Sequence, residues 1–473
     1  MIKKSVDFIF KLDARILFLI FLLSRISFLI AYYPGLMIWD TGSSIAQFYG
    51  FETHVISVSS NPDAILSNHH MILLTFLMGG AVKLGELIGN QNFGFFLYTS
   101  AQMLLTNAVV AYGLHVLRKK SFPILYVLAV AIYALHPLFS IWQITVSKDS
   151  LFSVFLLLLI ILLYQIVESN GTLLRKRKFL LLLTVANLMV ILTKPQGAYI
   201  SLLTFLVVAF VCRKQWKKIL CCGILPSILY LTLFTGVLLP ALNVAASGKQ
   251  EMLGFAFQQT ARYVRDHGED VTDAEQKAIA AVLPYDDLAQ LYSPHIQDPV
   301  KFCYSQTATD EELMDYLKAW AGMFLKHPQT YLAATWDNIR HFFVPLNNWY
   351  SYFPVLLENS NILKEHSVFT LHNTKIQPFY SIVSVVTEKL ATSLPTFIFF
   401  QPCFYVWLTM IVCVILLVRR NISAFVYLAP IVFTSLVLLI APCVDIRYVL
   451  PMVYCAPVFL MIVFEKKKER QYG

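Results

Sequence analysis

Long apolar runs separated by short polar segments dominate this chain. A helix needs roughly 20 apolar residues to cross about 30 Å of hydrocarbon. Ten runs meet or approach that length, near residues 15–33, 94–117, 122–140, 150–168, 179–193, 197–212, 219–240, 397–418, 422–441 and 446–464. The pattern predicts an all-α, polytopic membrane helix bundle with about ten transmembrane helices.

The composition agrees with this prediction. Of the 473 residues, 58% are hydrophobic and 14% are charged, a balance typical of membrane proteins. The first run is not expected to be a cleaved signal peptide, because it is long and no small-residue cleavage site follows it. Two further apolar stretches, 71–89 and 379–394, each contain a pair of opposite charges. They are predicted to be amphipathic helices lying in the outer membrane interface.

Clusters of basic residues set the predicted orientation. With ten spans, six clusters fall on one side, within residues 3–15, 118–120, 175–178, 213–218, 419–420 and 465–470. The positive-inside rule assigns that side to the cytoplasm. The sequence therefore predicts a multi-pass cell-membrane protein with both termini cytoplasmic and any active site on the extracytoplasmic face.

Three parts follow from this topology. We expect an N-terminal transmembrane catalytic module (1–240, seven spans), an extracytoplasmic, mostly helical segment (241–378), and an interfacial helix with three C-terminal spans (379–473). Helices of the outer segment are predicted near 250–282, 310–326 and 327–343. Residues 241–395 hold 17 acidic and 11 basic side chains, a net charge of −6. Because the whole chain has a net charge of +9, the remaining residues carry +15. This excess indicates anchoring to anionic lipid of the bilayer, and no nucleic acid is expected as a partner.

Ionisable groups at the apolar boundary are costly and are functional candidates. Asp40 follows the first span, and Asp149 opens the fourth directly after Lys148. The alternative for Asp40 is a helix cap that accepts backbone N–H bonds. The alternative for Lys148 and Asp149 is a surface charge pair at the end of a span.

Asn68, His69 and His70 lead into the first predicted interfacial helix. One interpretation is that these residues have a structural role only. The other is that they contact an anion or a lipid phosphate at the positive end of the helix dipole. Metal binding is a third interpretation, although adjacent residues rarely both ligate one ion well.

Two more cations lie at the outer boundary. Lys194, followed by Pro195 and Gln196, is in a short outer loop where the positive-inside bias disfavours lysine. Arg447 and Tyr448 open the last span, and Arg447 suits bidentate phosphate recognition. The alternative for Arg447 is pairing with Asp445, two residues before it.

This set fits group transfer from a phosphate-bearing lipid. A carboxylate would deprotonate an acceptor hydroxyl as general base, while cations stabilise charge on the departing phosphate. Asp40 is the expected base, and Asp149 is expected to orient the acceptor or the site lysines. The remaining candidates are donor-phosphate contacts (Lys194, Arg447, Lys148, His69, His70) and substrate contacts (Asn68, Gln196, Tyr448).

The order of these residues resembles the GT-C superfamily of polytopic glycosyltransferases. The resemblance is to the branch of protein-O-mannosyltransferases and lipid A aminoarabinose transferases, and to bacterial membrane families of uncertain substrate. It rests on Asp40, Asn68-His69-His70, Asp149, Lys194 and Arg447-Tyr448 with Pro451. It covers the first 200 residues and, loosely, the last 50. It implies a GT-C-like fold, a polyprenyl-phosphate sugar donor, inversion at the sugar carbon and an extracytoplasmic glycan, lipid or protein acceptor.

Two departures from the family pattern concern the acceptor and metal use. A single Asp40 stands where many relatives have Asp-Glu, and His70-Met71 replaces a proline pair. Because no second carboxylate accompanies Asp40 in sequence, metal-free chemistry without a cofactor is expected, with a divalent metal as the alternative. The eight cysteines show no metal-binding spacing and are expected to be free thiols.

Two other functions compete with a transferase. A polysaccharide polymerase or ligase would use diphosphate-linked oligosaccharides and typically has arginine-rich outer loops, whereas this outer segment is net acidic. A transporter or flippase of lipid-linked sugars would carry charges at mid-depth in two corresponding halves. In this chain the charges gather at one face.

Overall fold

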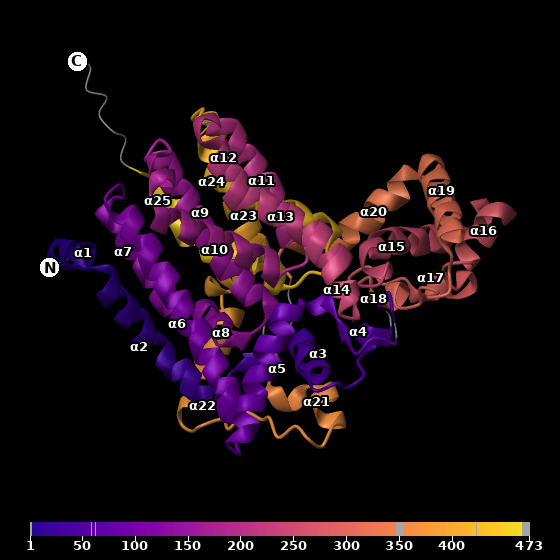
Figure 1. The fold of residues 1–473 in the computed structure, drawn as a ribbon, viewed down its shortest axis with the longest axis horizontal. Helices are drawn as coiled ribbons and strands as arrows, with labels where there is room; N and C mark the ends of the chain where they lie inside the picture. Colours follow the sequence, from indigo (N-terminus) through magenta and orange to yellow (C-terminus); the bar gives the residue numbers. More distant parts are fainter. Residues whose placement is uncertain (1, 58, 62, 347–353, 422, 466–473) are drawn as a thin grey trace.

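The structure is a computed structural model that describes residues 2–57, 59–61, 63–346, 354–421 and 423–465. These residues are mainly helical, with four strands of two residues each (Figure 1), which confirms the predicted all-α class. Residues 466–470, most of the last predicted cluster, lie outside the described residues.

Five stretches of the described chain are long and apolar enough to cross a membrane. They are α2 (Ala14–Ala31), α6 (Gln91–Arg118), α9 (Lys148–Glu168), α25 (Ile446–Val463) and the stretch Arg213–Ala241, which includes α12 (Trp216–Ile219), the π-helical η4 (Leu220–Ile224) and η5 (Tyr230–Leu238), α13 (Leu225–Leu229) and α14 (Leu239–Ala241). The helices α9 and α25 form the centre of the bundle, because nearly all of their side chains are buried.

The number of long helices is lower than the predicted ten. The run near 122–140 is divided into α7 (Pro123–Leu135) and α8 (Pro137–Gln143), which meet at 55°, so that at most six spans are found in the described residues by length and composition. The remaining runs form helices of 14 to 17 residues, and the shortest of them is continued by a 3-10 turn. They are α10 (Arg177–Thr193), α11 (Gly197–Val211), α23 (Pro402–Val418) and α24 (Ala424–Val437) with η12 (Leu438–Ile440).

A buried arginine supports the bend between α7 and α8. Pro137 lacks a backbone N–H and cannot continue the helix, so carbonyl groups at the end of α7 lose their helical partners. Arg25 of α2 is fully buried and donates to the carbonyl oxygens of Tyr133 and Ala134, and to the Gln143 Oε1 at 3.2 Å. Its charge is thus bound by helix-end dipoles, without a carboxylate contact among the described residues.

The two predicted interfacial segments form helices. They are α5 (Ile72–Leu87), which packs along α6, and α22 (Phe379–Thr392), which packs against α2. The opposite charges of α5 contact each other, with Lys83 Nζ 2.5 Å from Glu86 Oε1. Their place at a membrane surface stays a prediction.

A second body, which we call the helical domain (residues 250–339), projects from one end of the bundle (Figure 1). It has its own core, built around Phe257, Tyr263, Tyr316 and Tyr331. Its helices are α15 (Gln250–His267), α16 (Asp273–Ala280), α17 (Leu288–Leu291), α18 (Asp298–Lys301), α19 (Asp310–Lys326) and α20 (Pro328–Ile339).

The predicted helix 250–282 is wrong in one respect, because it is divided into two. The short 3-10 turn η6 (Gly268–Asp270) follows α15, and Thr272 then starts α16 with a capping box to Glu275. A capping box satisfies backbone donors that only a helix start leaves free, so the chain begins a new helix there. The predicted helix at 310–326 is confirmed as α19, and the one at 327–343 is α20 with the 3-10 turn η8 (Arg340–Phe342).

Candidate functional site

Two short parallel strand pairs place the site residues. The strands β1 (Leu36–Met37) and β3 (Thr145–Val146) pair with Met37 opposite Val146. Each strand leads directly into a helix, β1 into α3 (Trp39–Phe48) and β3 into α9. Asp40 and Asp149 therefore occupy equivalent positions, each three residues after a paired strand residue and in the first turn of a helix. Thr41 Oγ1 ties the two units together by donating to the Val146 carbonyl oxygen at 2.6 Å.

The second pair places the histidines. The strand β2 (Leu66–Ser67) pairs with β4 (Val244–Ala245), and the 3-10 turn η1 (Asn68–His70) follows β2. Asn68 Oδ1 accepts from the backbone N–H of Ile72, the first residue of α5, at 2.9 Å. His69 Nδ1 lies 2.7 Å from Ser247 Oγ, just beyond β4.

Asp40 is the centre of a charged cluster. Its Oδ2 lies 2.8 Å from Lys148 Nζ, 3.2 Å from Arg447 Nη1 and 3.8 Å from His70 Nδ1. Lys148 Nζ is also 3.3 Å from His70 Nδ1. The Asp40 side chain keeps 24% of its surface exposed, so solvent or a ligand can reach it.

A second ion pair adjoins the first through Tyr448. Lys194 Nζ lies 2.7 Å from Asp149 Oδ1, and both side chains are buried. The same ammonium group is 5.6 Å from the centre of the Tyr448 ring, a cation–π distance. Arg447 Nη2 donates to the Tyr448 hydroxyl at 3.1 Å. Tyr448 therefore touches both the Lys194–Asp149 pair and the Arg447–Asp40 pair.

Arg447 also contacts Asp445, the alternative partner considered above. Asp445 Oδ1 accepts from the Arg447 backbone N–H at 3.0 Å, and Asp445 Oδ2 lies 3.4 Å from Arg447 Nε. Residues two apart do not face each other within a helix, but Asp445 is the N-cap of α25 and stands outside its helical turns. The pairing with Asp445 thus coexists with the contact to Asp40.

The cations change the acidity of the cluster. Burial would raise the pKa of Asp40, but Lys148, Arg447 and His70 together hold that pKa well below its usual value. Burial, and then Lys148, lower the pKa of His70 well below its usual value and that of His69 to about 4. Near neutral pH Asp40 is therefore ionised, and His69 and His70 are neutral.

The structure brings together most of the predicted residues, but not all of them. One connected network holds Asp40, His70, Lys148, Asp149, Lys194, Arg447 and Tyr448, and His69 borders it through ring contact with His70. Asn68 accepts from the Ile72 backbone N–H and donates from Nδ2 to the Tyr230 hydroxyl at 3.3 Å. Gln196 precedes α11, and its buried Oε1 has no hydrogen-bond partner in the described part of the chain.

The sequence did not single out the helical domain as a neighbour of the site. Gln297 donates from its backbone N–H to the Pro442 carbonyl oxygen and from Nε2 to the Ala441 carbonyl oxygen, at 2.9 and 3.0 Å. Asn338 Nδ2 donates to the same Ala441 oxygen at 2.6 Å. These bonds hold the segment that leads into Asp445 and Arg447.

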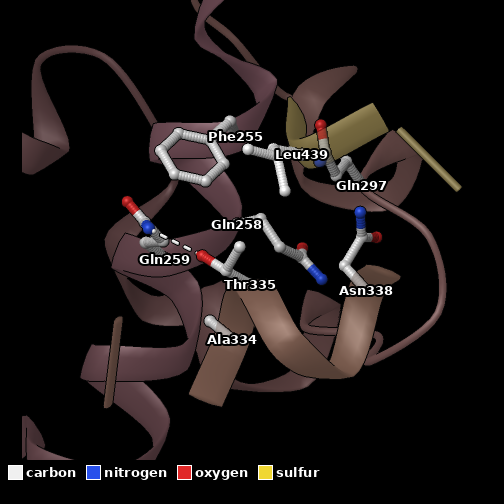
Figure 2. A pocket seen from close by; sticks show the side chains of 8 residues that line it. All are labelled: Phe255, Gln258, Gln259, Gln297, Ala334, Thr335, Asn338 and Leu439. Atoms are coloured by element: carbon white, nitrogen blue, oxygen red, sulfur yellow. Dashed lines mark hydrogen bonds between the residues drawn. The ribbon is translucent and has the colours of Figure 1, made fainter. Parts of the chain in front are cut away.

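Figure 2 shows the narrow cleft at this junction, which is lined by side chains from α15 and α20 and by Gln297. It is lined by Phe255, Gln258, Gln259, Gln297, Ala334, Thr335, Asn338 and Leu439. Gln259 Nε2 donates to Thr335 Oγ1 across it at 3.0 Å. Uncharged amides are common in any polar segment, so no sequence signal distinguished these residues.

A buried lysine lies in the same region. Lys301 contacts Glu251 Oε2 at 3.0 Å and Asp298 Oδ1 at 2.9 Å, and only 7% of its side chain is exposed. The charges of Lys301 and of its partner Glu251 also act on the pKa of His69, which Lys301 lowers and Glu251 raises. Lys301 lies in a polar segment with many charged residues, so the sequence did not distinguish it from its neighbours.

In chemical terms, the cluster combines a partly exposed carboxylate with three cations, each with donors to spare. Lys carries three N–H donors and Arg five, so the observed ion pairs leave donors free for an anionic ligand. Fold and site thus define an all-α protein with apolar helices long enough to cross a membrane and a charged site at the starts of three helices.

The chain belongs to a family of unknown function, DUF6020, whose model matches residues 57–472. No curated protein and no solved structure matches the chain.

Proposed function

We propose that this protein is a membrane glycosyltransferase that moves a sugar from a polyprenyl-phosphate donor to an extracytoplasmic acceptor hydroxyl, with inversion at the sugar carbon. The observation that carries the proposal is the convergence of Asp40 with Lys148, Arg447 and the Lys194–Asp149 pair, from segments far apart in the sequence. Buried and boundary charges of this kind are costly in a largely apolar protein, and an anionic ligand would offset that cost.

In the proposed reaction, Asp40 accepts the proton of the acceptor hydroxyl. The acceptor oxygen forms a bond to the anomeric carbon while the bond from that carbon to the donor phosphate oxygen breaks. The electron pair of the broken bond stays on the phosphate, whose added charge is stabilised by Arg447 and Lys194. Asp149 positions Lys194 by holding its ammonium group at 2.7 Å.

The low pKa of Asp40 sets a condition on this step. A carboxylate held by Lys148 and Arg447 is a weak base. If the donor phosphate draws these cations toward itself, the pKa of Asp40 rises and the carboxylate becomes a better base. Donor binding would therefore precede activation of the acceptor.

The topology belongs to the same proposal. We infer ten spans, with both termini cytoplasmic and residues 241–378 outside, so that the shorter helices α10, α11, α23 and α24 also cross. Cysteine labelling from outside the cell should then modify Cys303, while cysteines introduced at Lys119 or Lys176 stay protected. Labelling of either introduced cysteine from outside would contradict this topology.

The function is tested with purified protein in liposomes containing polyprenyl-phosphate hexoses and a lipid and glycan extract of the envelope as acceptor. We expect hexose to appear in the extract, detected by mass spectrometry. Asp315→Asn serves as a matched control, because Asp315 pairs with Lys318 on the surface of the helical domain. Movement of the donor across the bilayer with no covalent product would instead indicate a transporter.

A further inference from the structure

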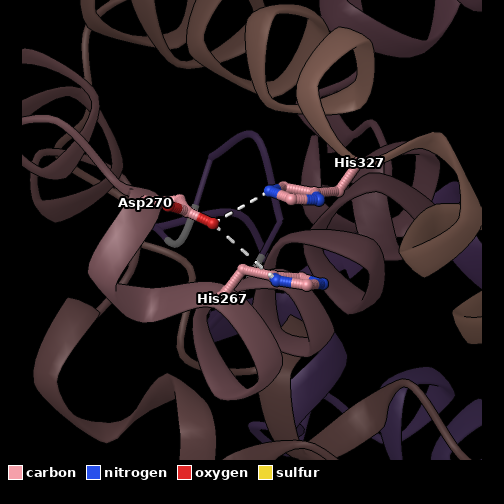
Figure 3. A group of neighbouring side chains, drawn as sticks. All are labelled: His267, Asp270 and His327. Atoms are coloured by element: carbon pink, nitrogen blue, oxygen red, sulfur yellow. Dashed lines mark hydrogen bonds and ion pairs between the residues drawn. The ribbon is translucent and has the colours of Figure 1, made fainter.

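Two histidines and an aspartate meet in the helical domain, away from the residues of the charged site. His267 ends α15, Asp270 ends η6, and His327 lies between α19 and α20. Figure 3 shows both imidazole rings with a nitrogen edge turned toward the Asp270 carboxylate. The three side chains come from the end of one helix, the turn after it and the start of another, so a ligand held by all three would join these elements.

The distances suit a shared metal ion. His327 Nε2 lies 2.9 Å and His267 Nδ1 3.9 Å from Asp270 Oδ2, and the three ligand atoms lie within 4.8 Å of one another. An ion bound at about 2.0–2.2 Å from each atom would bring such atoms to comparable separations. The two rings are stacked, with their centroids 3.9 Å apart and an angle of 5° between the ring planes. They would need to tilt, because the lone pairs lie in the ring planes, and the terminal torsion of histidine is soft.

The surroundings leave these ligand atoms available. His267 Nε2 contacts Thr330 Oγ1 at 2.9 Å, so the nitrogen on the other side of the ring is the one that faces Asp270. Hydrogen bonding of the second ring nitrogen is the usual support of a metal-bound histidine. The neighbouring Lys326 bonds to the Asp270 carbonyl oxygen and to Glu275 Oε2, at 3.1 and 2.7 Å. It therefore does not occupy the Asp270 carboxylate.

One carboxylate oxygen, Asp270 Oδ2, lies near both imidazoles. Only His327 is at hydrogen-bond distance from it, and His267 Nδ1 stands 3.9 Å away. A cation between the three groups would satisfy all of them. All three side chains are between 31% and 55% exposed, which leaves room for water as a fourth ligand.

We propose that His267, Asp270 and His327 bind a divalent transition-metal ion of the zinc class. Imidazole with carboxylate selects such ions over Mg²⁺ or Ca²⁺, which prefer oxygen ligands alone. The ion would fasten the end of α15 to the start of α20. This proposal does not depend on the proposed transferase activity.

The test uses the full-length protein in detergent after chelator treatment and dialysis. Isothermal titration should show one equivalent of Zn²⁺ bound, and Co²⁺ should give the visible absorption of a tetrahedral nitrogen–oxygen complex. His327→Gln and Asp270→Asn should each abolish both signals, while His372→Gln, an exposed histidine elsewhere in the chain, should leave them unchanged. Thr330→Val should weaken Zn²⁺ binding by about 10–100-fold, since it removes only the support of His267.

Three outcomes would overturn the proposal. They are no Zn²⁺ binding by the wild type, equal binding by the ligand variants, or an octahedral Co²⁺ spectrum that the variants do not alter. Should a ligand variant fail to fold, the Co²⁺ spectrum of the wild type and the Thr330→Val titration still decide the question.

Discussion

The ion pair Lys194–Asp149 in the bundle and the ion pair Lys318–Asp315 in the helical domain differ in burial. The side chains of Lys194 and Asp149 are 9% and 1% exposed, whereas those of Lys318 and Asp315 are 71% and 53% exposed. Both pairs have similar distances, 2.7 and 2.8 Å, so distance alone does not distinguish them. Burial does, because an unpaired charge is costly only where water cannot reach it. The comparison teaches that an ion pair of the same length contributes little to stability at an exposed position and is needed for stability at a buried one.

The largest expected effect is on stability. Lys194→Ala leaves the Asp149 carboxylate buried without its partner and should lower the free energy of unfolding by about 3–5 kcal/mol. Lys318→Ala should change it by no more than about 0.5 kcal/mol. Denaturation of both variants in the same detergent, followed by circular dichroism, gives the comparison.

A double variant sharpens this result. Lys194→Met with Asp149→Asn removes both charges and should recover part of the loss, because no uncompensated charge remains. Equal stability of Lys194→Ala and Lys318→Ala would show that water reaches Asp149. The two ion pairs would then not differ in their contribution to stability.

A smaller effect is expected on donor binding. Arg447→Ala should weaken binding of a polyprenyl-phosphate sugar by about 1.5–3 kcal/mol, the range for hydrogen bonds to charged groups. A polyprenyl alcohol, which lacks the phosphate, should bind equally to wild type and variant. Arg265→Ala is the control, since Arg265 pairs with Asp266 in the helical domain. Unchanged binding of the phosphate lipid to the Arg447 variant would remove Arg447 from the donor site.

The smallest effect concerns pH. A histidine whose pKa is lowered on folding binds a proton more readily when unfolded, so stability falls as pH drops below about 6.5. Burial and Lys148 lower the pKa of His69 to about 4, and that of His70 also falls. The melting temperature should therefore decrease from pH 7 to pH 5, with a smaller decrease in His69→Gln. Asp40, whose pKa is depressed, contributes stability that is lost only below about pH 4.

An identical pH slope in wild type and His69→Gln would show that His69 is solvated or already protonated when folded. The control for this measurement is His372→Gln, whose side chain is exposed and should leave the slope unchanged.

The sequence indicated the charged residues of the bundle because ionisable groups are rare there. Asp40, Lys148, Asp149, Lys194 and Arg447 each stand at the edge of an apolar run, and the structure places all five in one network. Their roles in a reaction stay predictions. What sequence could not supply was the strand pairing that aligns Asp40 with Asp149, because two-residue strands leave no periodic pattern.

Other features escaped prediction for physical reasons. Arg25 lies inside an apolar run, and only the bend at Pro137 reveals the carbonyl groups that it binds. In the helical domain, charges are frequent and mostly exposed, so the buried Lys301 resembled its neighbours in sequence. Apolar runs also do not reveal where a helix ends, which is why ten runs yielded at most six long spans among the described residues.

The most direct test of the central claim is the turnover of Asp40→Asn with a polyprenyl-phosphate hexose in liposomes. Loss of the general base should lower the transfer rate by about 10²-fold or more, with donor binding retained and with Asp315→Asn at the wild-type rate. Near-normal turnover of the Asp40→Asn protein would contradict the account, and would leave Asp40 as an ion-pair partner that holds Lys148 and Arg447 in place.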